Sequence, residues 1–68
     1  MREWLIKARN DKGLSQAEMC RRLGVSQPTY WEYEHGQSTP RPPIALKIGR
    51  LLDVDWTQFY QMEETVVN

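Results

Sequence analysis

The stretch SQAEMCRRLGVSQPTYWEYEHG, residues 15–36, decides the fold because it encodes two short helices and the turn between them. Ser15 offers its hydroxyl as an N-cap, and Glu18, three residues later, can return a hydrogen bond to complete a capping box. This pairing at a spacing of three is a strong signal for the start of a helix. We therefore expect the first of the two helices to begin at Gln16.

The second half of the stretch contains the end of that helix and the start of the next. Gly24 has no Cβ, so it can adopt the left-handed conformation that ends a helix. Ser26 then offers a second N-cap, and Pro28 falls in the first turn, where its missing amide hydrogen costs nothing. We expect the second helix to run from Gln27 to the residue before Gly36. The short connector is typical of a helix-turn-helix.

This segment resembles the helix-turn-helix of phage repressors and Cro proteins, which is also called the XRE-like family. Its pattern runs S-Q-x-x-L-A-x-x-x-G-V-S-Q-x-T-[VI]-x-x-[WIL]-E-x-G. The positions that fill the pattern here are Ser15, Gln16, Met19, Cys20, Gly24, Val25, Ser26, Gln27, Thr29, Tyr30, Tyr33, Glu34 and Gly36. Further matches are Leu5, Ala8 and Arg9 before the motif and residues 48–59 after it. The resemblance implies an all-α fold, a compact five-helix bundle of the lambda-repressor-like DNA-binding type.

Two further helices are expected on either side of the motif. Residues 2–11 form the first, with an apolar inner side. Residues 37–43 contain three prolines and no periodicity, so they are expected to form an extended connector, with Pro43 at the first position of the next helix. Residues 44–52 place apolar side chains at the spacing of an amphipathic helix.

The last expected helix is short and ends at Tyr60. Asp55 and Gln58 are spaced as another capping box, which indicates its start. The helix before it contains Gly49, which costs about 1 kcal/mol relative to Ala unless a neighbouring helix packs closely there. We expect one domain over residues 1–61, and residues 62–68 are expected to be a tail or an added contact.

The composition is that of an ordinary globular domain, with 40% hydrophobic and 26% charged residues. A single cysteine, Cys20, excludes an internal disulfide, and we expect it to be a small buried core residue rather than a reactive thiol. The beginning of the chain has no hydrophobic region of a signal peptide, and no apolar run is long enough to cross a membrane. A cytoplasmic protein without a membrane partner is expected.

The net charge is zero, but the charges are unevenly distributed. Residues 1–50 contain all nine Lys and Arg and only five acidic side chains. The only charged side chains of residues 51–68 are acidic. One His, one Cys and the absence of a glycine-rich loop or a carboxylate pair in a supporting context argue against catalysis. We expect no enzyme activity, no metal, no cofactor and no small-molecule substrate.

The second motif helix is expected to lie in the major groove of double-stranded DNA, as the resemblance implies. A rotation of 100° per residue places Tyr30, Tyr33 and Glu34 on its inner side. The predicted base contacts on its outer side are Gln27, Pro28, Trp31 and Glu32. Gln27 is the strongest candidate because its amide can pair both ways with adenine. The alternative is a solvated glutamine on a helix surface.

Backbone contacts are predicted around this helix. By family analogy, Gln16 touches a phosphate, helped by the positive end of its helix, and braces Gln27. Arg41 is a plausible clamp in the connector, although a free surface charge is an equal alternative. His35 is either a surface residue at a helix C-terminus or a phosphate contact. The full set of predicted backbone contacts is Gln16, Ser26, Thr29, His35, Ser38, Thr39 and Arg41.

Trp31 and Glu32 depart from the family, which often has a small residue followed by Lys, Arg or Gln at these positions. A carboxylate in the groove either accepts a hydrogen bond from cytosine or repels phosphate. Two functions therefore remain open. The first is a sequence-specific transcriptional regulator of the Cro or repressor type. The second is an adaptor-like or antitoxin-like protein-interaction module with little or no DNA binding, in which Trp31 is an apolar anchor.

Two structural expectations complete the prediction. The resemblance places Arg9 and Glu34 where the family joins its first helix to the recognition helix, so a structural ion pair is expected. A homodimer is expected because one such domain reads only half of a two-fold symmetric site. Its candidate interface residues are Trp56, Val66 and Val67, with local packing as the alternative role of Trp56.

Overall fold

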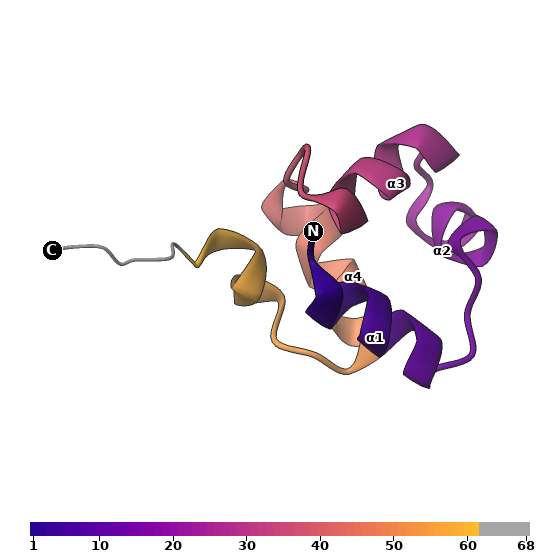
Figure 1. Ribbon diagram of the computed structural model, residues 1–68, viewed down its shortest axis with the longest axis horizontal. Helices are drawn as coiled ribbons and strands as arrows, with labels where there is room; N and C mark the ends of the chain where they lie inside the picture. The colour runs from indigo at the N-terminus through magenta and orange to yellow at the C-terminus, as the bar shows by residue number, and fades with distance from the viewer. Residues whose placement is uncertain (62–68) are drawn as a thin grey trace, which may run out of the picture.

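The computed structural model describes residues 1–61, and every regular secondary-structure element in this range is a helix (Figure 1). The elements are the α-helices α1 (Glu3–Asp11), α2 (Gln16–Leu23), α3 (Gln27–His35) and α4 (Pro42–Leu52), followed by the 3₁₀ helix η1 (Trp56–Tyr60). The all-α prediction is confirmed. None of the helices in residues 1–61 has both the length and the apolar character needed to cross a membrane.

The helix ends of the motif follow the local chemistry of the sequence. Ser15 Oγ accepts a hydrogen bond from the Glu18 amide at 3.1 Å, and Glu18 Oε1 accepts one from the Ser15 amide at 3.0 Å, so the capping box is present. Ser26 Oγ caps α3 by accepting from the amide of the third helical residue at 3.2 Å. Gly24 and Gly36 end α2 and α3 with φ angles of 74° and 77°, which residues with a Cβ rarely adopt.

The predictions for the two outer helix starts need correction. α4 begins at Pro42, one residue earlier than expected, so Pro43 is its second residue. Asp55 does not form a capping box with Gln58, because its side chain instead accepts from the Thr57 amide at 3.0 Å. Gln58 donates to the main-chain carbonyl of Asp55 at 3.2 Å. These bonds fit the tighter 3₁₀ geometry of η1, the short last helix that the sequence predicts to end at Tyr60.

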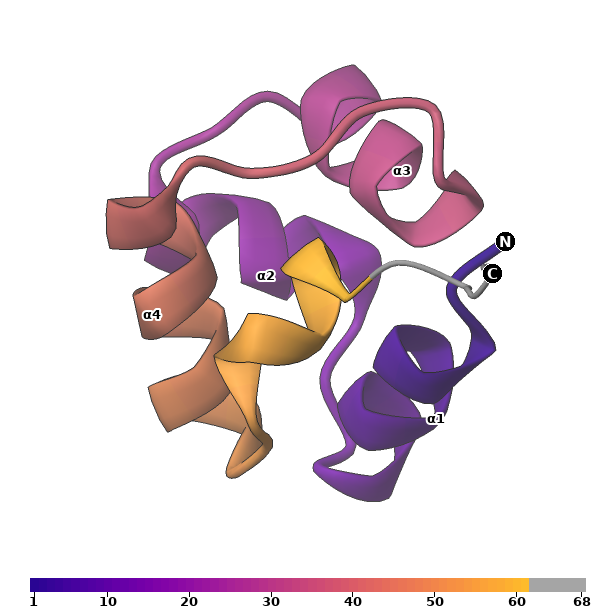
Figure 2. The ribbon, with the colours of Figure 1, turned by 90° about the vertical axis from the view of Figure 1, so that its left-hand side faces the viewer.

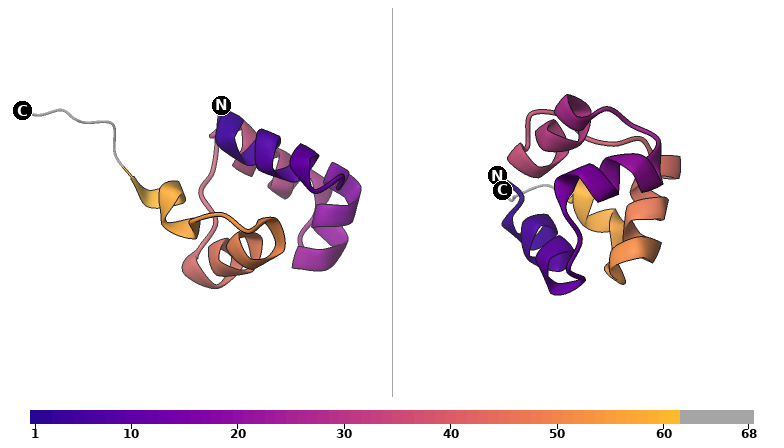
Figure 3. Two further views of the ribbon diagram at one scale, coloured as in Figure 1. Left: turned by 90° about the horizontal axis from the view of Figure 1, so that it is seen from below. Right: turned by 90° about the vertical axis from the view of Figure 1, so that its right-hand side faces the viewer.

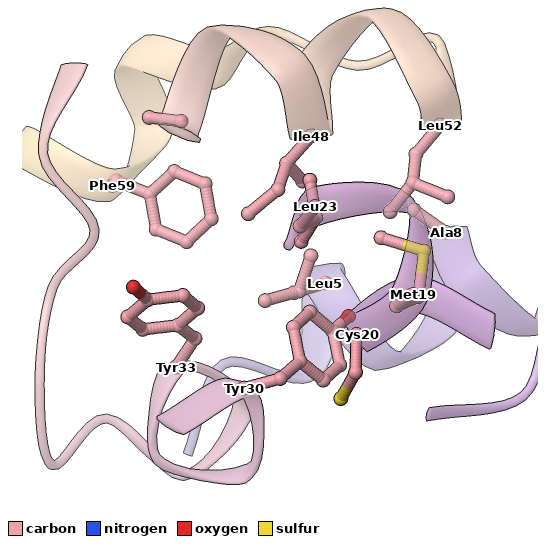
Figure 4. Close-up of a cluster of buried hydrophobic side chains, with 11 residues drawn as sticks. Leu5, Ala8, Met19, Cys20, Leu23, Tyr30, Tyr33, Ile48, Leu52 and Phe59 are labelled. Carbon is pink, nitrogen blue, oxygen red and sulfur yellow. The ribbon is translucent and has the colours of Figure 1, made fainter. Parts of the chain in front are cut away.

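The core draws on every helix, as Figure 4 shows. Its members are Leu5, Ala8, Met19, Cys20, Leu23, Tyr30, Tyr33, Ala45, Ile48, Leu52 and Phe59. Cys20 is buried as predicted, and burial raises the pKa of its thiol. In a domain of this size such a small core stabilises the fold only modestly.

Trp56 is half-buried and packs against this core, so part of its side chain has the local-packing role that was the alternative to a dimer contact. A Cβ added to Gly49 would lie 3.0 Å from Trp56 Cβ and 3.0 Å from the Val54 carbonyl oxygen. The glycine in α4 is therefore explained by the close approach of η1. The Trp56 ring also meets Tyr60 edge to face, with ring centroids 6.0 Å apart.

The helices are arranged so that α3 forms one edge of the molecule. In Figure 2, α3 and the connector that follows it run along the top, whereas α1, α4 and η1 lie below them. Both views in Figure 3 show the connector running from the end of α3, near the N-terminus, to the start of α4. The outer side of α3 is therefore not covered by any element of residues 1–61.

Candidate nucleic-acid interface

α3 has a buried side and an exposed side, as its sequence predicts. Tyr30, Tyr33 and Glu34 are buried, and Glu34 is only 1% exposed. Gln27 is exposed on the opposite side, and Trp31 is 40% exposed, which is unusual for so large an apolar side chain. The helix therefore presents polar and aromatic groups to solvent while its inner residues fix its position.

A surface hollow of about 220 Å³ lies between the start of α2 and the outer side of α3. It is lined by Gln16, Gln27, Pro28 and Trp31. Three of the four predicted base-contact residues thus meet around one concave site, together with a predicted backbone contact. The fourth, Glu32, is not among the lining residues.

Glu32 lies half-buried on another part of α3. Its carboxylate is close enough to Tyr33 to help raise the pKa of that hydroxyl, although burial is the larger cause. Its main-chain carbonyl accepts a hydrogen bond from the Gln37 amide at 3.0 Å, at the C-terminal end of the helix. The structure therefore separates this carboxylate from the hollow that contains Gln27.

Gln16 is oriented by the interior of the protein. Its Nε2 atom donates to Glu34 Oε1 at 2.9 Å. A carboxylate only accepts hydrogen bonds, so this contact fixes the amide nitrogen inward and leaves the amide oxygen on the other side. The amide oxygen is the atom left to brace Gln27, which lines the same hollow, and this contact stays a prediction.

A buried ion pair joins α1 to α3, where the resemblance places one. Arg9 Nε donates to Glu34 Oε2 at 2.6 Å, and Arg9 Nη2 donates to Glu34 Oε1 at 3.3 Å. Arg9 Nη1 also donates to the Leu14 carbonyl at 2.9 Å. Because Gln16 shares the same carboxylate, the first three helices meet at Glu34. This network sets the position of the exposed face of α3.

The titration of these groups reflects the same geometry. Burial acts to raise the pKa of Glu34, but hydrogen bonds from Arg9 and Gln16 and the nearby Tyr30 hydroxyl outweigh it and hold the pKa below its ordinary value. Burial, and then the Glu34 carboxylate, raises the pKa of Tyr30. The Tyr30 hydroxyl is buried beside that carboxylate without a hydrogen bond of normal geometry. The carboxylate is therefore charged and the tyrosine neutral near pH 7.

Trp31 and His35 form a stacked pair one turn apart on the exposed side. Their ring centroids are 3.7 Å apart, with an angle of 16° between the planes. His35 Nδ1 lies 2.9 Å from the Trp31 carbonyl oxygen. A carbonyl oxygen only accepts, so Nδ1 carries the hydrogen and Nε2 is the ring nitrogen left for another partner. If His35 contacts a phosphate as predicted, the atom that does so is Nε2.

The other predicted backbone contacts lie at the two ends of α3. Ser26 and Thr29 are at its start, and their hydroxyls hydrogen-bond each other at 2.8 Å. Ser38, Thr39 and Arg41 are in the connector beyond its end, and Arg41 is the N-cap residue of α4 with an exposed side chain. Figure 2 shows this connector running from the end of α3 to the start of α4 along the same edge of the molecule.

Arg2 holds the connector in place, and the sequence did not indicate this role. Its guanidinium donates to the Tyr33 carbonyl at 2.7 Å, to the Ser38 carbonyl at 2.8 Å and to Thr39 Oγ1 at 2.8 Å. It also lies over the Phe59 ring, 5.1 Å from the centroid. Two of these three hydrogen bonds are to main-chain carbonyls, so no side-chain pattern could have revealed them.

The predicted dimer residues are only partly described. Val66 and Val67 lie outside the described residues, as does the predicted tail over residues 62–68. Trp56 is half-buried and lies close to Gly49, so only part of its side chain is accessible. Tyr60 beside it is 41% exposed and donates to the Pro40 carbonyl at 2.7 Å.

Comparisons with known proteins agree with this geometry. The helix-turn-helix family model matches residues 5–59. The chain is 36% identical over 61 residues to the uncharacterized HTH-type transcriptional regulator YqaF of Bacillus subtilis strain 168, covering 90% of this chain and 80% of that protein. It is 38% identical over 52 residues to the uncharacterized HTH-type transcriptional regulator YqaE of the same organism, covering 76% of this chain and 45% of that protein.

A solved structure shows the same fold. The N-terminal DNA-binding domain of SinR from Bacillus subtilis matches with a TM-score of 0.71 over 93% of both chains, at 20% sequence identity. The resemblance inferred from the motif of residues 15–36 is confirmed by the family match, which extends over most of the chain. This chain belongs to the XRE-type helix-turn-helix family.

Proposed function

We propose that this chain is a sequence-specific DNA-binding transcriptional regulator of the Cro or repressor type. In this proposal α3 lies in the major groove of double-stranded DNA, where an α-helix fits and where each base pair presents a distinct pattern of groups. We propose that it acts in the cytoplasm, where a regulator of this type meets its DNA.

The observation that carries the proposal is the hollow formed by Gln16, Gln27, Pro28 and Trp31 on the uncovered side of α3. Gln27 is exposed at the N-terminal end of α3, which is the part of a recognition helix that reaches base edges. Its amide can donate to N7 and accept from N6 of one adenine. The Glu34 network behind it holds the helix in a fixed position for such a contact.

Phosphate contacts are proposed on both sides of the groove. The first amides of α2 have no partners within the helix and lie at its positive end, so they suit a phosphate. Gln16 is at this end of α2. Arg41 in the connector is proposed to contact the backbone on the other side of α3, with Ser38 and Thr39 beside it. Ser26, Thr29 and Nε2 of His35 complete the proposed set.

Selection of bound sequences from random DNA, followed by a salt titration, tests the proposal. A regulator that contacts several phosphates should lose affinity linearly in log salt, with a slope of about −0.9 per phosphate. Gln27→Ala should weaken binding to the selected site by about 5- to 150-fold, as expected for loss of a bidentate base contact. Gln61→Ala is the matched control, because Gln61 is exposed and far along the chain from α3.

A homodimer is proposed as the DNA-binding form. Two copies related by a two-fold axis would place their α3 helices in successive major grooves about 34 Å apart. The selected sequences should then show inverted half-sites at that spacing. Trp56 stays the candidate interface residue through the exposed part of its side chain. Sedimentation showing a monomer both free and on a symmetric site would exclude the dimer.

The exposed Trp31 supports one alternative, a protein-interaction module with little DNA binding. Large aromatic side chains are enriched at the centres of protein interfaces, and this one is 40% exposed in the free chain. Such an adaptor should select no sequence from random DNA and should show no salt-dependent DNA affinity. The same two measurements therefore separate the alternatives.

A further inference from the structure

We propose that Trp31, held in position by His35, reads the C5-methyl group of a thymine in the site that α3 binds. The inference rests on the proposed function. It gives a specific role to Trp31, which stands where the family often has a small residue. Trp31 is then a specificity-determining residue, and His35 is a positioning residue that acts through it.

The stacked pair fixes the indole before DNA arrives. His35 covers one face of the Trp31 ring at a centroid distance of 3.7 Å and is itself held by the hydrogen bond from Nδ1 to the Trp31 carbonyl. An exposed side chain that is already ordered loses less conformational entropy on binding than a free one. The pair is therefore a rigid apolar surface rather than a mobile side chain.

The same stack decides how the indole can meet DNA. A wedge between two base pairs needs both of its faces free, because each face stacks on one base. One face of Trp31 is occupied by His35, so insertion into the base stack is excluded without breaking the pair. The edge and the outer face are left, and these can only lie against the groove surface of the bases.

The chemistry around Trp31 matches one base pair best. Pro28 and Trp31 form apolar walls of the hollow, and Gln27 contributes an amide beside them. Among groups in the major groove, the thymine C5-methyl is the only apolar one, and its adenine partner presents the donor and acceptor that an amide pairs with. The hollow therefore fits A·T-containing sequence, with Gln27 on adenine and Trp31 on the methyl of the same or the next pair.

The Glu32 carboxylate, which is also on α3, lies where it does not oppose the contact between Trp31 and the thymine methyl. Glu32 is half-buried near Tyr33 and does not line the hollow. The Trp31 indole and the Gln27 amide are both uncharged, so their contacts with bases need no charged partner. Selectivity at this position should thus depend on shape and apolar contact, with little dependence on salt.

The test replaces each thymine of the selected site in turn by deoxyuracil, which lacks only the methyl group. Burial of one methyl group corresponds to about a 4-fold change in affinity. The unmodified protein should therefore lose about 3- to 10-fold at one or two thymines and nothing at the others. Trp31→Ala should bind the thymine and uracil forms of those positions equally, whereas Gln61→Ala should behave as the unmodified protein.

His35→Ala tests the positioning role. It should reduce the uracil effect at the same thymines. Loss of the phosphate contact proposed for Nε2 would not do this, because a phosphate contact carries no sequence information and weakens binding to every site alike. A full uracil effect in His35→Ala would overturn the bracing role. Thermal melting of each variant confirms folding, and Trp31→Phe, which should keep part of the effect, serves as a second variant if Trp31→Ala does not fold.

The outcomes separate this inference from the proposed function. Salt-dependent, sequence-selective binding with no uracil effect in the unmodified protein overturns only the role of Trp31. Equal uracil effects in the unmodified protein and Trp31→Ala do the same, because the methyl is then read by another residue. Absence of sequence-selective DNA binding overturns the proposed function and this inference together.

Discussion

Glu34→Ala should destabilise the protein severely, because it removes the side chain at which three helices meet. The carboxylate is 1% exposed and receives two hydrogen bonds from Arg9, at 2.6 and 3.3 Å, and one from Gln16 at 2.9 Å. After the change, the Arg9 guanidinium, whose side chain is only 13% exposed, has no counter-charge. The Gln16 amide loses its acceptor at the same time.

The size of the effect follows from the burial of the pair. Removing one partner of a buried ion pair costs about 3 to 5 kcal/mol, because the remaining charge is left uncompensated. A domain of this length has a total stability of only roughly 3 to 10 kcal/mol. At about 4 to 8 °C per kcal/mol for a small domain, the melting midpoint should fall by at least about 12 °C.

Thermal unfolding followed by circular dichroism measures this change, and the chain contains a matched control. Lys7 and Asp11 also form an ion pair, at 2.9 Å, but their side chains are 77% and 61% exposed. Asp11→Ala should therefore cost only about 0.3 to 0.5 kcal/mol. If Glu34→Ala shifts the melting midpoint no more than Asp11→Ala does, the buried pair is not the stabilising contact described above.

A second variant tests the reason for the loss. Adding Arg9→Met to Glu34→Ala removes the uncompensated charge and restores an apolar side chain of similar length. Buried ion pairs can often be replaced by apolar residues at little cost. The double variant should therefore be more stable than Glu34→Ala alone. A double variant that is less stable by the sum of both single effects would show that Arg9 and Glu34 act independently.

Four further outcomes are expected. The pKa of the Glu34 carboxyl is lower in the folded protein than in the unfolded chain, so the stability that the ionised carboxylate contributes is full above about pH 4.5 and is lost as the pH falls through the pKa of the folded state. Glu34→Gln should weaken this loss of stability in acid, measured as melting midpoints at successive pH values. Arg2→Met should destabilise the domain by about 1 to 3 kcal/mol in urea unfolding and should reduce the salt slope of DNA binding, because the connector loses its anchor. Gly49→Ala should lower the melting midpoint despite its better helix propensity, since the new Cβ would meet Trp56 and a carbonyl oxygen at 3.0 Å. The Cys20 thiol should react with a thiol reagent far more slowly in the native protein than in denaturant, because it is buried and burial raises its pKa.

Local chemistry in the sequence was enough to predict the motif. The capping box of Ser15 and Glu18 and the left-handed glycine at Gly24 involve residues at most three or four apart, and each appears in the structure. Asp55 and Gln58 have the same spacing, yet they form a different set of bonds because η1 is a 3₁₀ helix. Spacing alone does not distinguish the two helix types when the segment is this short.

Long-range contacts were predictable only where the family resemblance supplied a partner. Arg9 and Glu34 are 25 residues apart, and nothing in their neighbourhoods in the sequence pairs them. Arg2 matched no motif position, and its partners are carbonyl groups and a hydroxyl 31 to 37 residues away. The half-burial of Trp56 depends on its meeting with Gly49, which the amphipathic pattern of α4 does not determine.

For the candidate site, the sequence predicted which side of α3 faces outward but not how its side chains group together. The helical rotation places Trp31 and Glu32 on one side, yet only Trp31 lines the hollow with Gln27. The stack of Trp31 on His35 depends on the rotamers of two adjacent turns. The helical period of about 3.6 residues determines which side of α3 a side chain starts from, whereas contacts with neighbouring side chains determine where its end group lies.

The division of α3 into two sides has a consequence for how binding preferences can change over evolution and in the laboratory. The inner residues Tyr30, Tyr33 and Glu34 are constrained by packing and by the ion pair. Gln27 and Pro28 on the outer side are exposed, so substitutions there cost the fold little. A library that varies these two positions with Trp31 can therefore sample new target sequences on an unchanged framework. Paralogues can diverge in the same way, acquiring separate targets without compensating changes elsewhere in the chain.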